Sequence, residues 1–123
     1  MTKAAALHSF FGGFGLTAYE ENSVPDDAVF PYLTYSLTTD SFSGYPSTIT
    51  ISLWYRSTSW TAANAKCEEI SVAIGLGGQL IECDGGRIWI KRGQPFANSM
   101  GDVNDELIKR KIINVGADYL TLN

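Results

Sequence analysis

Residues 48–56 read TITISLWYR, and this stretch decides the fold. Apolar side chains recur at every second position, which is the period of a β-strand with one buried face. The side chains fall into two sets, with Ile49, Ile51, Leu53 and Tyr55 on one face and Thr50, Ser52 and Trp54 on the other. The stretch therefore predicts a strand that contributes one face to the core.

The same period appears on both sides of this stretch. Leu33, Tyr35 and Leu37 alternate with polar residues before it, and a connection with Gly44 and Pro46 joins the two strands. Neighbouring strands joined by a short Gly/Pro loop favour an antiparallel hairpin. Further strands are expected at Thr17–Glu21, Gln79–Cys83, Arg87–Lys91 and within Leu107–Leu122, with a tight turn at Asp84-Gly85-Gly86.

Two segments follow the helical period instead. Leu7, Phe10, Phe11 and Phe14 share one face of a helix from Lys3, which Gly12, Gly13 and Gly15 end. A second stripe consists of Trp60, Ala63, Cys67, Ile70 and Ile74, after possible N-cap hydroxyls at 57–59 and before the glycines at 75–78.

The segment Arg92–Asp105 contains glycine, proline and asparagine, so we expect a long irregular loop there. The loop is expected to end at residue 105 or 106. Whether this loop becomes ordered only on assembly is left open. The element order predicts an α+β fold, a mostly antiparallel sheet with two helices packed against it. The 123 residues have the size of a single domain, 1–123.

Composition excludes several functional classes. A hydrophobic fraction of 45% is that of a globular chain, and no run of about 18 apolar residues suggests a membrane span. The start of the chain lacks the features of a signal peptide, so we expect a cytosolic protein. The net charge of −4 disfavours specific nucleic-acid binding, and the basic run Lys109-Arg110-Lys111 is interpreted as a solvated strand entrance or an intersubunit contact.

Residues able to do chemistry are few. His8 is the only imidazole, and its aromatic helix neighbours favour a structural role. Cys67 and Cys83 are expected to be free thiols, because a reducing compartment disfavours a disulfide. The residues around Asp102 do not match a calcium loop, and the glycine clusters follow helices, so they cannot bind phosphate at a helix N-terminus. We therefore expect no enzyme, no catalytic residue, no metal and no cofactor.

Aromatic residues are the unusual feature. Trp54 and Trp89 are expected on the strand face opposite the isoleucines, and Phe42, Tyr45 and Phe96 in loops. Such residues are enriched at protein interfaces. The predicted subunit or partner interface consists of Phe42, Tyr45, Trp54, Trp89, Arg92, Phe96 and Asp102. The loop around Phe42 and the segment 92–105 would supply two dissimilar contact surfaces, as a ring subunit needs.

Several segments resemble small proteins of the head-to-tail joining region of long-tailed phages and prophages, and most closely the tail terminator, or tail completion, proteins. The segments are Leu7–Phe11, Ala18–Asn22, Val24–Ala28, Pro31–Tyr35, Leu53–Ser57 and Ile88–Gly93. The resemblance implies an α/β fold with a central sheet flanked by helices. It also implies a homo-oligomeric ring, a hexamer in this family, which caps the tail tube protein and docks the head completion or connector protein.

Such a protein would assemble in the host cytoplasm and reside in the neck of the virion. A negative net charge would suit a lumen through which DNA passes without adhering. Two alternatives remain open. One is a head completion or minor capsid protein of the same region, and the other is a small-molecule-binding or enzymatic α+β domain.

Overall fold

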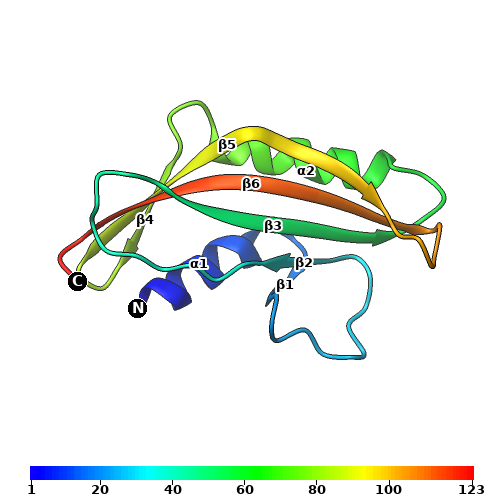
Figure 1. Ribbon diagram of the computed structural model, residues 1–123, viewed down its shortest axis with the longest axis horizontal. Helices are drawn as coiled ribbons and strands as arrows, with labels where there is room; N and C mark the ends of the chain where they lie inside the picture. Colours follow the sequence, from blue (N-terminus) through cyan, green and yellow to red (C-terminus); the bar gives the residue numbers. More distant parts are fainter.

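The computed structural model describes residues 1–123 as two helices packed on one six-stranded sheet (Figure 1). The helices are α1 (Lys3–Phe11), the 3-10 turn η1 (Gly12–Phe14) and α2 (Thr61–Ile74), and the strands are β1 (Thr17–Glu20), β2 (Tyr32–Tyr35), β3 (Ser47–Arg56), β4 (Gln79–Cys83), β5 (Gly86–Gly101) and β6 (Ile108–Thr121). The strand order is β1-β2-β3-β6-β5-β4. Only β1 and β2 are parallel, so the predicted α+β class with a mostly antiparallel sheet is confirmed.

The two central strands, β3 and β6, show why this sequence forms a sheet. Ile49 lies opposite Val115 and Ile51 opposite Ile113, and all four side chains are fully buried. Because strand side chains alternate between faces, the residues between them point to the other face of the sheet. The alternation read from TITISLWYR is therefore the alternation between core and surface.

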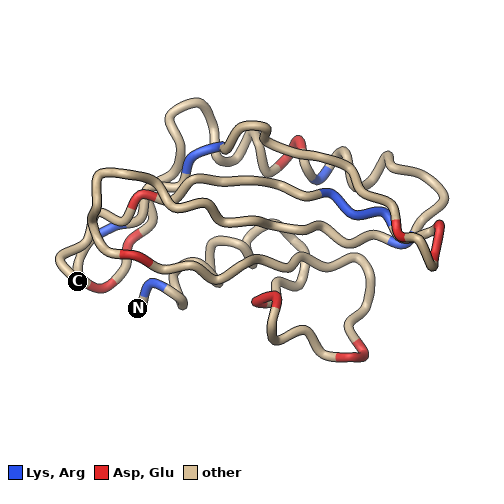
Figure 2. Tube along the Cα trace, in the orientation of Figure 1, with Lys and Arg blue, Asp and Glu red and all other residues tan.

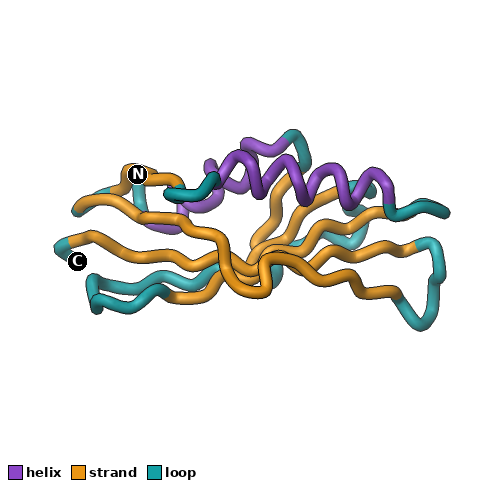
Figure 3. Tube along the Cα trace, turned by 90° about the horizontal axis from the view of Figure 1, so that it is seen from above, coloured by secondary structure: helices purple, strands orange, loops and turns teal.

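Both helices cover the same face of the sheet (Figure 3). α1 buries Leu7 and Phe11 against it, and α2 buries Ala63, Cys67, Ile70 and Ile74, as their spacing predicted. One cluster of 21 buried residues joins the two helices to the strands. Neither helix has the length and apolar character needed to cross a membrane.

The prediction of a long loop over Arg92–Asp105 is wrong. β5 continues to Gly101, and only a short turn at 102–107 separates it from β6. Between Arg92 and Ala97 the register shifts, so that four residues of β5 lie opposite the single residue Asn114 of β6. This bulge accommodates the glycine and proline that suggested a loop, because residues in a bulge do not have to form backbone hydrogen bonds with the neighbouring strand. The side chain of Asn114 donates a hydrogen bond of 3.1 Å to the Pro95 carbonyl within it.

The first hairpin forms as predicted, but its connection is longer than expected. β2 and β3 pair antiparallel, with Leu33 opposite Leu53. β2 ends at Tyr35, so residues 36–46 all belong to the connection, which carries the exposed side chains of Phe42 and Tyr45.

Candidate functional site

No helix covers the other face of the sheet (Figure 3), and only the 36–46 connection lies against one end of it. We call it the open face and define it by the half-buried or exposed side chains that point away from the helices: Tyr19, Tyr32, Trp54, Trp89, Lys91, Met100, Arg110, Ile112, Asn114, Asp118 and Leu120. These residues come from β1, β2, β3, β5 and β6. An apolar and aromatic sheet face without a second layer is the most prominent surface feature of the molecule.

One half of the open face is a continuous stack of rings and a guanidinium. The rings of Tyr19 and Tyr32 meet edge to face at 5.8 Å, and those of Tyr32 and Trp54 lie nearly parallel at 6.1 Å. The guanidinium carbon of Arg110 is 4.6 Å from the centre of the Trp54 ring. The stack therefore links β1, β2, β3 and β6 across the sheet.

Hydrogen bonds from the strands hold this stack in place. The indole Nε1 of Trp54 donates to Thr34 Oγ1 at 2.9 Å, and Nε of Arg110 donates to Ser52 Oγ at 3.1 Å. Burial, with a smaller contribution from Tyr19, raises the pKa of Tyr32 above its ordinary value. The Tyr32 side chain is therefore neutral near pH 7. Because hydrogen bonds already fix the side chains of Trp54 and Arg110, these side chains lose little conformational entropy when they bind a partner.

The other half of the open face centres on Trp89. Its Nε1 donates to the Gly77 carbonyl at 2.8 Å, and Nζ of Lys91 lies 4.3 Å from the ring centre. Lys91 also forms an ion pair of 2.5 Å with Asp118. The 36–46 connection reaches this site, because Phe42, Tyr45 and Trp89 line one hollow of about 190 Å³.

The structure thus unites some of the predicted interface residues. Phe42, Tyr45 and Trp89 share that hollow, with Phe42 65% and Tyr45 81% exposed. Trp54 and Asp102 line a second, smaller hollow at the far end of the same face. Arg92 is exposed at the β5 bulge, where it lines a third hollow with Lys91 and Pro46.

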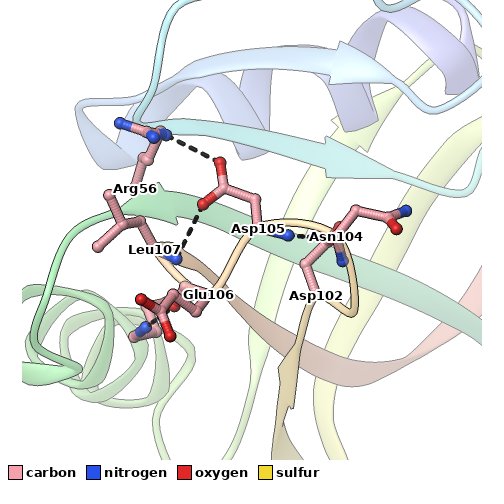
Figure 4. A network of polar contacts seen from close by, with 7 residues as sticks. Arg56, Asp102, Asn104, Asp105, Glu106 and Leu107 are labelled. Atoms are coloured by element: carbon pink, nitrogen blue, oxygen red, sulfur yellow. Dashed lines mark hydrogen bonds and ion pairs between the residues drawn. The ribbon is translucent and has the colours of Figure 1, made fainter.

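Two predicted residues have roles within the fold. Phe96 lies in β5 rather than in a loop, and its ring packs against the core cluster. Asp102 shapes the turn between β5 and β6 (Figure 4), because its Oδ1 accepts hydrogen bonds from the backbone N–H groups of Asn104 and Asp105. Asp105 in turn pairs with Arg56 at 3.0 Å. Whether Phe96 or Asp102 also contacts a partner remains a prediction.

Sequence reasoning missed Tyr32 and Met100 as members of the open face, and it considered Arg110 only as part of the basic run 109–111. Arg110 lies directly opposite Trp54 in the β3–β6 register, and Met100 lies opposite Arg110 in the β5–β6 register. The signal was present in the alternation of β6, but it requires knowing that β6 lies between β3 and β5.

The groups able to do acid–base or nucleophilic chemistry include one close pair, His8 and Tyr35. His8 Nδ1 is 3.0 Å from the Tyr35 hydroxyl, at the edge of α1. Cys67 and Cys83 are free thiols, and burial raises the pKa of both, which is opposite to the shift that activates a nucleophile. No three His, Cys, Asp or Glu side chains gather as a metal site would require.

Comparison with known proteins adds no relative to this description. The chain matches no protein-family model, no curated protein and no solved structure.

Proposed function

We propose that this chain is a structural subunit of the head-to-tail joining region of a long-tailed phage. In this proposal it is a tail terminator, which caps the tail tube protein as a ring and docks the head completion or connector protein. The resemblance of segments in α1, β1, β2, β3 and β5 to that group supports the proposal.

The observation that carries the proposal is the open face itself. Trp, Tyr, Met and Arg side chains, which are enriched where proteins meet, lie together on a broad sheet surface. A six-stranded sheet with helices on one side only leaves most of its other face free for another protein layer. This arrangement favours assembly with other protein subunits.

The hollows give less support to a small-molecule site. The apolar hollow at Phe42 and Trp89, about 190 Å³, is smaller than the roughly 300–1,000 Å³ of typical ligand pockets. A larger hollow of about 540 Å³ beside the β5 bulge is lined mostly by polar residues, glycine and proline. Typical ligand pockets are predominantly apolar, so neither hollow combines the required size and lining.

Deleting the gene from the phage or prophage that encodes the chain tests the proposal. Electron microscopy of the particles should show tails of irregular length, or heads and tails that fail to join. Loss of a head completion protein would instead leave tails of normal length and heads that leak DNA. Normal infectious particles would contradict any role in this region.

Complementation with variants makes the same test specific for the open face. Trp54→Ala should restore fewer joined particles than the wild-type gene. Val72→Ala is the matched control, because Val72 is 77% exposed on α2, away from the open face. Equal complementation by the two variants would show that the open face does not carry this function.

A further inference from the structure

All charged residues of the segment that holds β1 and β2 are acidic, whereas basic residues lie along β5 and β6 (Figure 2). The segment 17–35, which holds β1 and β2, contains Glu20, Glu21, Asp26 and Asp27 and no Lys or Arg. β5 and β6 together contain six Lys or Arg residues and one carboxylate, Asp118. β1, at one edge of the sheet, therefore belongs to a purely acidic segment, while β5, near the other edge, and β6 carry mostly cations. Carboxylates lie beside these cations as well, in Glu82 of β4 and in Asp102, Asp105 and Glu106 of the 102–107 turn.

Most of these charged groups form no ion pair within the molecule. Of the six cations in β5 and β6, only Arg87 and Lys91 form ion pairs. The remaining four are Arg92, Lys109, Arg110 and Lys111. None of the four carboxylates of segment 17–35 pairs with a cation. Unpaired charges of opposite sign on opposite sides are suited to meet between molecules.

Both sides also present an unpaired strand edge. β1 is the terminal strand, and its outer edge has no neighbour. On the other side β4 pairs with β5 only over Gly86–Ile90, so the outer edge of β5 is bare from there to Gly101. The last part, Ala97–Gly101, reads ANSMG and contains neither the charges nor the proline that protect natural edge strands.

The strand directions suit a contact between these two edges. β1 and β2 are parallel, and each later neighbour (β2–β3, β3–β6, β6–β5) is antiparallel, so β1 and β5 run in opposite directions. A rotation that continues the sheet from one copy to the next therefore sets β1 antiparallel to the bare part of β5. In that pairing Glu20 and Glu21 lie toward the bulge that carries Arg92.

We propose that the basic edge binds the acidic edge of a second copy of this chain. The basic edge is the outer edge of β5 at 92–101 with Arg92, together with Lys111 of the neighbouring strand β6, whose Nζ donates a hydrogen bond of 3.0 Å to Ser99 Oγ of β5. The acidic edge is β1 with Glu20, Glu21, Asp26 and Asp27. This inference rests on the proposed function in that it names the contact between neighbouring ring subunits. Pairing β5 with a second β5, or β1 with a second β1, would oppose like charges. The contact is therefore head to tail, and it closes into a ring if its rotation does.

Charge reversal on each edge separately tests the contact. The first variant carries Glu21→Lys and Asp26→Lys, and the second carries Arg92→Glu and Lys111→Glu. We expect the wild type to form species larger than two copies at millimolar concentration, and each variant to stay monomeric in sedimentation equilibrium. Mixing the two variants should restore assembly, because each contact between a copy of one variant and a copy of the other joins opposite charges again.

Two controls accompany this test. Glu68→Lys on the exposed surface of α2 and Arg87→Glu, where β4 covers β5, reverse charges away from the bare edges and should assemble as the wild type does. Restoration on mixing shows that both variants are folded, and thermal melts check each one alone.

Hydrogen exchange should also slow at 17–20 and 97–101 when the wild type associates.

Several results would overturn the inference: a wild type that is monomeric throughout, a largest species of two copies, variants that assemble normally, or a mixture that stays monomeric. None of these results decides the proposed function, which the gene deletion tests separately. A deletion phenotype without edge-dependent assembly would keep the function and remove this contact. If assembly depends on the edges but the deletion leaves normal infectious particles, the contact stands and the proposed function is contradicted.

Discussion

Arg110 shows how one residue connects the fold to the open face. Its backbone lies in β6 opposite Trp54, its guanidinium stacks on that ring at 4.6 Å, and its Nε binds Ser52. A stacked guanidinium gains cation–π attraction while its remaining N–H groups stay available. Arg110 can therefore stabilise β3–β6 pairing in the free molecule and donate hydrogen bonds to a partner.

Trp89 permits a test at the residue scale. Trp89→Ala removes the hydrogen bond to the Gly77 carbonyl and the Lys91 cation–π contact. We expect the free energy of unfolding to fall by about 2 kcal/mol, from about 1 kcal/mol for each of the two interactions. Chemical denaturation measures the change.

Trp89→Phe is the matched variant, because it retains a ring beneath Lys91 and loses only the hydrogen bond. Its cost should be about half that of Trp89→Ala. An alanine variant as stable as the wild type would show that the Gly77 and Lys91 contacts do not stabilise the fold.

At the scale of elements, the sequence predicted the helices and strands that can be recognised from the spacing of apolar residues within a single segment. The period of two in Ile49, Ile51 and Leu53 and the stripe of Ala63, Cys67 and Ile70 both reflect burial against one surface, so the strand and the helix were found. The second half of β5 was missed because Gly93 and Pro95 interrupt its alternation. Only the partner strand β6, distant in sequence, shows that this segment is a bulged strand.

The bulge makes a prediction at this scale. A Cβ added at Gly93 would lie 2.6 Å from the backbone oxygen of Asn114, closer than real contacts allow. Gly93→Ala should therefore destabilise the fold by about 1–3 kcal/mol, the usual cost of overpacking. Gly101→Ala is the matched control on the same strand, because a Cβ there meets nothing within 4 Å. Equal melting temperatures for the two variants would contradict the close β5–β6 packing at the bulge.

At the scale of the whole molecule, strand order decided what the sequence could not. Phe42, Tyr45, Trp54 and Trp89 were expected at a surface, and all four lie on or beside the open face. Their division into two groups depends on β6 lying between β3 and β5, a long-range pairing that local patterns do not encode. The separation of acidic β1–β2 from basic β5–β6 depends on the same order.

The strand order also links the proposed function to the proposed contact between copies. In the proposed function the open face contacts other proteins of the particle, and in the proposed contact the edges of the sheet bind copies of the chain itself. A ring subunit needs both kinds of surface, one for its neighbours and one for the structures above and below it. Here the helices occupy one face only, which leaves the other face and both edges available.

The most direct test of the account is a cryo-electron microscopy map of the particles made by the phage or prophage that, in our proposal, encodes this chain. We expect several copies arranged as a closed ring at the head-proximal end of the tail tube, with their open faces in contact with other protein. Particles that lack the chain, or that carry it only elsewhere, would contradict the account.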